Sequence, residues 1–162
     1  MSVEVVRGGG ELLDEVEPLW LALVAHHHEV APQLGPVRGD GESWAMRRSQ
    51  YEQWLGDRGA FVVLARDGAR PVGYAFVAID KPGPTWPGDG DTGWVETLSV
   101  DPGARGQGVG RLLLDRVESE LAKLGIEEMR LDAIASNDGA LRFYEREGFE
   151  TALVILRRRR IP

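Results

Sequence analysis

Apolar positions along the chain recur with two different periods, one typical of helices and one typical of strands. Alternation at every second residue marks short strands, whereas spacings of three and four residues mark amphipathic helices. The clearest helical stripe begins at Val109 and ends before a glycine stop at Gly125. The predicted elements are a strand at 3–6, helices at 12–27 and 43–55, strands at 61–66, 72–79 and 92–100, a helix at 109–124, a strand at 129–135, a helix at 138–147 and a strand at 151–157.

The order of these elements, β-α-α-β-β-β-α-β-α-β, predicts a single α/β domain over residues 1–162. The Asp67-Gly68 turn signal joins two early strands as a hairpin, whereas the later strands are separated by helices and require crossovers. The expected fold is therefore a mixed sheet flanked by helices. Pro18 interrupts the first helical stripe and predicts a kink or a split there.

A long loop is predicted at residues 81–93, which contain three prolines and four glycines. A loop of this length suits either a lid over a bound substrate or an exposed connection without a role. The sequence leaves both interpretations open.

Composition restricts the class of protein. The chain has 162 residues, of which 43% are apolar and 28% are charged, as is typical of a soluble globular protein. No apolar run reaches the roughly 18 residues of a membrane span, and residues 1–4 lack the features of a signal peptide. The lack of cysteine excludes disulfides, thiolate metal sites and a covalent cysteine intermediate. These features predict a cytoplasmic protein.

The formal net charge of −7 argues against general nucleic-acid binding, which needs a basic surface, and mildly favours a cationic substrate. The exception is the basic run from Arg157 to Arg160, which we interpret as a solvated chain end rather than a contact with phosphate or a partner. A second run, His26-His27-His28, does not predict a metal site. Consecutive helical side chains point about 100° apart, so the three imidazoles cannot face one ion.

Three glycines, Gly106, Gly108 and Gly110, stand between the strand at 92–100 and the helix that follows. Such a loop turns tightly and exposes main-chain N–H groups at a helix N-terminus, where the helix dipole favours an anion. It lacks both the Gly-Lys-Ser/Thr of a Walker A loop and the spacing and position of a dinucleotide fingerprint. The loop is either a diphosphate site, with Arg105 and Arg111 nearby, or a turn whose glycines only permit close packing.

A later segment, from Asn137 to Phe149, combines an asparagine at a strand exit, a short helix and a Gly-Phe pair. Together with the loop, it resembles the GCN5-related N-acetyltransferase (GNAT) family. Arg105-x-x-Gly108-x-Gly110 is similar to that family's acyl-CoA signature, and the later segment is similar to its Asn…Phe-Tyr-x-x-x-Gly-Phe element. The resemblance covers residues 61 to the end, whereas the first 60 residues match in layout alone.

The resemblance implies a mostly antiparallel sheet and acetyl-CoA as co-substrate. Main-chain N–H groups of the glycine loop would hold the CoA diphosphate, and the end of the strand at 92–100 would pair with the pantetheine arm. Asn137 would hydrogen-bond that arm or lie beside it. The implied CoA-binding residues are Leu98, Ser99, Val100, Arg105, Gly106, Gln107, Gly108, Val109, Gly110, Arg111 and Asn137.

The resemblance also places Tyr144 near the thioester sulfur, where its phenol would protonate the leaving thiolate. The alternative for Tyr144 is an ordinary core aromatic. The attacking amine must lose a proton, because an ammonium is not a nucleophile. Glu96, expected to share a strand face with Leu98, is the preferred base, and Asp132 on the neighbouring strand is the rival. Either carboxylate could instead bind only water or an arginine, with a water chain serving as base.

The sequence thus predicts an acetyl-CoA-dependent N-acetyltransferase in which a primary amine attacks the thioester directly. A main-chain N–H near Leu98 would meet the oxyanion. A small-molecule acceptor is preferred to protein N-termini or lysines, a homodimer would be in keeping with the family, and nucleic-acid and membrane partners are not expected. The alternative is a non-catalytic acyl-CoA-binding or regulatory module that has the same fold.

Overall fold

The computed structural model describes residues 1–86, 88 and 90–160. Within them the chain forms β1 (Val3–Gly8), α1 (Leu13–Val30), α2 (Asp40–Asp57), β2 (Phe61–Asp67), β3 (Arg70–Asp80), β4 (Thr92–Val100), α3 (Val109–Lys123), β5 (Glu128–Leu131) and α4 (Asp138–Arg146). Short 3-10 turns occur at Gly10–Leu12, Pro32–Leu34 and Pro102–Ala104.

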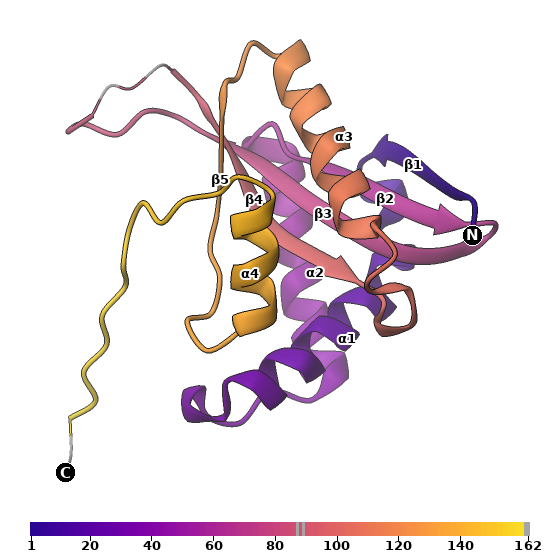
Figure 1. Ribbon diagram of the computed structural model, residues 1–162, viewed down its shortest axis with the longest axis horizontal. Coiled ribbons are helices and arrows are strands. Elements are labelled where there is room, and N and C mark those ends of the chain that lie inside the picture. The colour runs from indigo at the N-terminus through magenta and orange to yellow at the C-terminus, as the bar shows by residue number, and fades with distance from the viewer. Residues whose placement is uncertain (87, 89, 161–162) are drawn as a thin grey trace.

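The strands form one sheet in the order β1-β2-β3-β4-β5. Neighbouring strands are antiparallel except β4 and β5, which run parallel because α3 crosses between them. Helix α3 lies over one face of the sheet, and α1 and α2 lie over the other (Figure 1). The prediction of a mixed, mostly antiparallel sheet flanked by helices is therefore confirmed.

Both faces of the sheet are buried, so the central strands carry apolar side chains on both sides. On the α3 face, Val95 packs with Leu113 and Leu121, and on the opposite face Tyr51 packs with Phe76. Glycine at position 93 lets α3 approach closely, since a Cβ atom there would lie 2.4 Å from Leu121 Cδ1. These contacts fix β4 between two helical layers.

Helix α1 continues through Pro18 without the split that was one of the two predicted outcomes, and it includes the histidine run. Pro18 is exposed, so the carbonyl that loses its helical N–H partner lies on the side of the helix that faces water. No helix in the described part of the chain is both long and apolar enough to cross a membrane.

Strands β4 and β5 divide partway along their length. Their pairing ends at Val95 and Leu131, yet β4 continues to Val100. Beyond Val95, the described residues supply no strand that pairs with this edge of β4. The predicted strand at 129–135 is correspondingly short, because the chain leaves the sheet after Leu131 and turns toward α4. The split leaves the main chain of β4 beyond Val95 without a partner strand on the β5 side.

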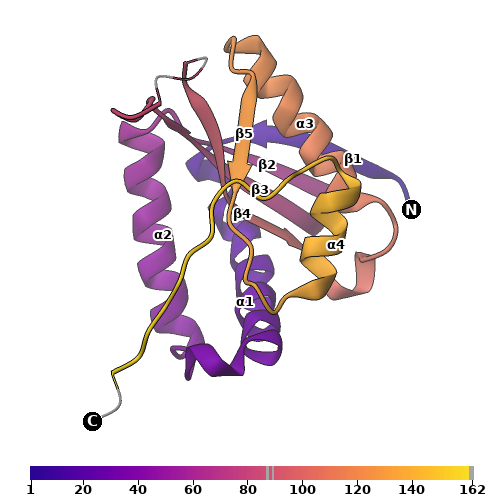
Figure 2. The ribbon, with the colours of Figure 1, turned by 60° about the vertical axis from the view of Figure 1, so that its left-hand side comes forward.

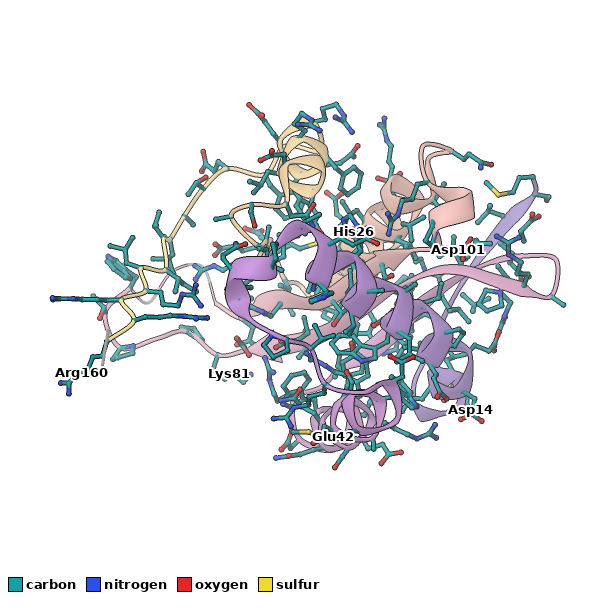
Figure 3. All side chains as sticks on the ribbon, turned by 90° about the horizontal axis from the view of Figure 1, so that it is seen from below. Asp14, His26, Glu42, Lys81, Asp101 and Arg160 are labelled. Carbon is teal, nitrogen blue, oxygen red and sulfur yellow. The ribbon has the colours of Figure 1, made fainter. Side chains whose placement is uncertain are left out.

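The predicted last strand at 151–157 is wrong for the described chain. Residues 151–160 form no strand, and each is exposed. The segment runs from α4 toward the connection between α1 and α2 (Figure 2), where Arg157 and Arg159 donate hydrogen bonds to the Gln33 carbonyl at 3.1 and 3.0 Å. Its apolar pattern predicts a buried strand, but no strand among the described residues pairs with it, and Figure 3 shows the segment extending to Arg160 beyond the body of the molecule.

Candidate active site

The glycine loop joins the end of β4 to the start of α3. Gly106 and Gly108 have φ values of +73° and +84°, which L-residues rarely adopt, and a Cβ at either position would meet only open space. The first main-chain bond of α3 runs from the Leu112 N–H to the Gly108 carbonyl, at 3.1 Å. The N–H groups of residues 109–111 therefore precede the helical ladder and are available to an anion.

Gly110 has a different role from the other two glycines. A Cβ there would lie 2.9 Å from Phe143 Cζ, so this glycine allows the N-terminus of α3 to pack against α4. The packing interpretation of the loop therefore applies to Gly110, whereas the structure leaves the diphosphate interpretation a prediction. Gly106 and Gly108 provide the turn, and Gly110 provides the close packing.

The charged and amide side chains of the loop fold back on their own main chain. Arg105 Nε donates to the Val100 carbonyl at 3.2 Å, and Gln107 Nε2 donates to the Gly103 carbonyl at 3.1 Å. Arg111, by contrast, is exposed on the first turn of α3. The loop is therefore shaped by its own residues and presents main-chain amides rather than side chains.

The last residues of β4 have committed their side chains to the core. Leu98 and Val100 pack on the α3 face, as does Val109 at the start of α3. Ser99 Oγ donates to the Leu19 carbonyl of α1 at 2.9 Å. What these residues can offer a ligand on the split edge of β4 is their main chain.

Asn137 caps α4, where its Oδ1 accepts the Ala140 N–H at 3.3 Å. Only 7% of the residue is exposed. The cap fixes the amide, so that its Nδ2 donor is held at the start of α4. Capping and ligand contact are compatible because they use different atoms of the same amide.

Tyr144 lies between two other aromatic rings, with ring centres 5.2 Å from Phe143 and 5.5 Å from Phe149. Burial raises the pKa of Tyr144 to about 12. The phenol therefore keeps its proton throughout the physiological range. No hydrogen bond joins its hydroxyl to a described residue. Since no fully buried side-chain oxygen or nitrogen of the described chain lacks a partner, this O–H group contacts solvent and is available to a ligand.

Glu96 is the extra residue of a β-bulge, because the β3–β4 register shifts between Thr97 and Val95. The bulge places Glu96 on the α2 side of the sheet together with Thr97, whereas Leu98 packs on the α3 side. The expectation that Glu96 and Leu98 share a face was therefore wrong, since strict alternation fails at a bulge.

The Glu96 carboxylate is paired. Its Oε1 accepts from Arg58 Nη1 at 2.7 Å, and Arg58 also binds Asp80. The Glu96 side chain is 17% exposed, so the pair is partly shielded from water. Asp132, in contrast, is exposed and makes no ion pair with any described residue. Both candidate bases stand one residue beyond the last paired rung, Val95–Leu131, so the structure brings them to the same level of the split.

Sequence reasoning missed a buried hydroxyl network beside the bulge. Tyr51 of α2 bonds to Thr97 Oγ1 at 2.6 Å and to the Tyr74 hydroxyl at 3.1 Å. Burial raises the pKa of Tyr51 and raises that of Tyr74 further. The only available signal was a tyrosine on the apolar face of the second helix, which by itself predicts core. The network holds α2 against β4 next to Glu96.

One other predicted feature, the loop after β3, lies apart from the glycine loop. The loop after β3 lines a shallow hollow with Trp94 and Arg130 at the Thr92 end of β4. Since β4 spans roughly 27 Å at about 3.4 Å per residue, this hollow is far from the glycine loop. Pro87 and Asp89 of the predicted loop at 81–93 lie outside the described residues. In the histidine run, burial and His26 lower the pKa of His27.

Comparisons with known proteins find similar sequences and similar folds. A model of the Acetyltransferase (GNAT) family matches residues 23–149. The chain is 33% identical over 152 residues to a mycothiol acetyltransferase of Geodermatophilus obscurus, an alignment that covers 92% of this chain and 44% of that protein. The chain thus spans less than half the length of this relative.

Solved structures share the fold at low identity. A variant of the BH1408 protein from Bacillus halodurans has a TM-score of 0.80 at 19% identity and covers 99% of this chain and 100% of its own. AAC(6')-Iy in complex with the bisubstrate analogue CoA-S-monomethyl-acetylneamine has a TM-score of 0.72 at 20% identity and covers the same shares.

Proposed function

Because this chain belongs to the Acetyltransferase (GNAT) family, we propose that it transfers an acetyl group from acetyl-CoA to a primary amine. The observation that carries the proposal is the split between β4 and β5. The glycine loop, the Asn137 cap, Tyr144 and the two candidate bases all belong to segments that start or end at this split. A donor on the side of the glycine loop and an acceptor on the side of Glu96 would therefore meet where β4 and β5 separate.

The donor would be held mainly by main-chain groups. The amides of residues 107–111 suit the CoA diphosphate, since they precede the ladder of α3 and add to its dipole. On the edge of β4 that faces away from β3, Leu98 to Val100 pair with no described strand. The pantetheine arm would lie along this edge as an added strand does. Asn137 Nδ2 would donate to the same arm.

In the reaction the amine nitrogen forms a bond to the acyl carbon, and the carbon–sulfur bond breaks. Tyr144 would donate a hydrogen bond to the departing sulfur. With a pKa of about 12, the phenol is a weaker acid than a thiol, whose pKa is about 8.5. Its part is therefore to stabilise the thiolate by a hydrogen bond as the carbon–sulfur bond breaks. Tyr144 keeps its own proton, and the CoA thiolate takes a proton from water as it leaves.

The amine must arrive uncharged, so its proton passes to a base. Glu96 would take that proton through its second carboxylate oxygen, directly or through water, while Arg58 holds the first. A main-chain N–H of β4 near Leu98 would stabilise the oxyanion. We propose a small-molecule amine as acceptor and the cytoplasm, where acetyl-CoA is available, as the location.

Amine-dependent release of CoA tests the proposal. The purified chain is given acetyl-CoA and a panel of primary amines, and free thiol is measured together with the mass of the acetylated amine. The chain has no cysteine, so all thiol detected is CoA. The expected result is thiol and acetylated amine in equal amounts. CoA binding without amine-dependent thiol release would instead favour a non-catalytic CoA-binding module.

A further inference from the structure

Arg47 is the exception among the partly buried arginines. Five arginines are partly buried, and four of them bind carboxylates of the described chain: Arg48, Arg58, Arg66 and Arg116. Arg47 makes neither an ion pair nor a hydrogen bond to any described side chain. No fully buried side-chain nitrogen of the described chain lacks a partner, so the Arg47 N–H groups contact solvent and are free to donate to an anion from outside the chain.

Aromatic rings hold this guanidinium in place. Its Cζ lies 4.4 Å from the ring centre of Trp20, 5.3 Å from that of Tyr51 and 5.9 Å from that of Trp54. Stacking on these faces orients the planar fork without using its N–H groups. Arg47 is thus positioned and still able to donate, which is what a binding residue requires.

The position is one side chain away from the bulge of β4. The Tyr51 hydroxyl bonds to Thr97, which follows Glu96 in the bulge, and the Tyr51 ring lies beside Arg47. The charges of Arg47 and Glu96 both act on the pKa of Tyr51, and in opposite directions. Arg47 therefore lies on the acceptor side of the split, near the candidate base.

We propose that Arg47 binds a carboxylate of the acceptor, so that the acceptor is an amino acid, a short peptide or another amine that carries a carboxylate. This inference rests on the proposed function. A single guanidinium presents two parallel N–H groups, which match a carboxylate of charge −1. A phosphate would need a second cation, and the nearby Arg58 is already bound to Glu96 and Asp80.

Paired acceptors test this specificity. Amino acids and dipeptides are compared with their C-terminal amides, and a phosphate-bearing amine such as O-phosphoethanolamine is included. Wild type should favour the carboxylates. Arg47→Gln should lower kcat/KM for them by about 10- to 100-fold, chiefly through KM, and leave the amides nearly unchanged. Arg47→Lys should recover part of the loss.

Arg48→Gln is the matched control, because Arg48 is the next residue and already binds Asp14 and Glu52. It should leave the preference intact. Equal losses for carboxylates and amides in Arg47→Gln, or a wild-type preference for the phosphate-bearing amine, would overturn the inference. Binding of N-acetylglycine against N-acetylglycinamide, followed by calorimetry with CoA present, gives a readout that does not depend on turnover.

Discussion

In the proposed site, the two sides of β4 differ in the groups that they offer to a ligand. On the donor side, the glycine loop offers main-chain amides, and its own side chains fold back to shape it. On the proposed acceptor side, Arg47 and Tyr51 come from α2 and Glu96 comes from β4. Hydrogen bonds between residues distant in the sequence hold the two elements together. Main-chain recognition imposes glycine at fixed spacings and therefore leaves a motif, whereas side-chain recognition leaves none.

The largest effect should come from filling the donor side. Gly108→Val places a branched side chain where φ is +84° and where a CoA diphosphate would lie. Loss of about two charge-assisted hydrogen bonds corresponds to roughly a 1,000-fold weaker affinity for CoA. Isothermal titration calorimetry measures the affinity of each variant for CoA. Gly125→Val, at the other end of α3 with φ +73°, carries similar strain and should leave CoA binding intact. Equal affinities in the two variants would mean that the loop does not hold the diphosphate.

Removing the Tyr144 hydroxyl should separate chemistry from donor binding. Tyr144→Phe is expected to lower kcat by about 10- to 1,000-fold, because the departing sulfur loses its hydrogen-bond donor. The affinity for CoA should change little. Steady-state kinetics and calorimetry measure the two quantities. A wild-type kcat in this variant would remove Tyr144 from the mechanism.

Tyr144 also predicts a dependence of stability on pH. Its folded pKa of about 12 lies above the ordinary value of 10.0, so the folded state favours the protonated phenol. That contribution is complete below pH 10 and is lost as the pH rises toward 12. Urea denaturation across this range should show a smaller decline in Tyr144→Phe than in wild type. Identical declines would mean that the phenol is not buried as described.

The two candidate bases can be ranked on the acceptor side. Glu96→Gln should lower kcat/KM by roughly 10- to 100-fold, whereas Asp132→Asn should change it by less than about 3-fold. Glu96→Gln also disturbs Arg58, so Asp80→Asn, which removes the other partner of that arginine, is the control. The reverse ranking would assign the base to Asp132.

The smallest effect should come from Ser99. Its side chain bonds to α1, whereas only its main chain is proposed to contact the donor. Ser99→Ala removes the bond to the Leu19 carbonyl and should lower the free energy of unfolding by about 1 kcal/mol, with CoA affinity unchanged. Urea denaturation measures the loss, with the exposed Ser119→Ala as control. A marked loss of CoA affinity would show that the side chain contributes to binding.

Much of the fold could be predicted from the sequence, because alternation and helical stripes record burial directly. Strand β4 was predicted with its observed bounds, at 92–100. The bulge at Glu96 was missed because it depends on the register with β3, which one strand's pattern does not contain. The segment at 151–157 has the pattern of a strand. It forms none because no other strand of the described residues pairs with it.

The site shows the same division. The loop and the Asn137 to Phe149 segment could be found as motifs, because capping and positive φ restrict residue type locally. No role for Arg47 could be predicted, because its stacking on Trp20 arises only when α1 packs against α2. The pairing of Arg58 with Glu96 joins residues 38 positions apart and was equally invisible.

Mapping CoA onto the main-chain amides tests the central claim most directly. Amide chemical shifts of the protein are recorded by NMR with and without CoA. We predict that the largest changes fall on residues 107–111 and on Leu98 to Val100, where β4 has separated from β5. Changes confined to the hollow at the far end of β4, around Lys81, Trp94 and Arg130, would contradict the account.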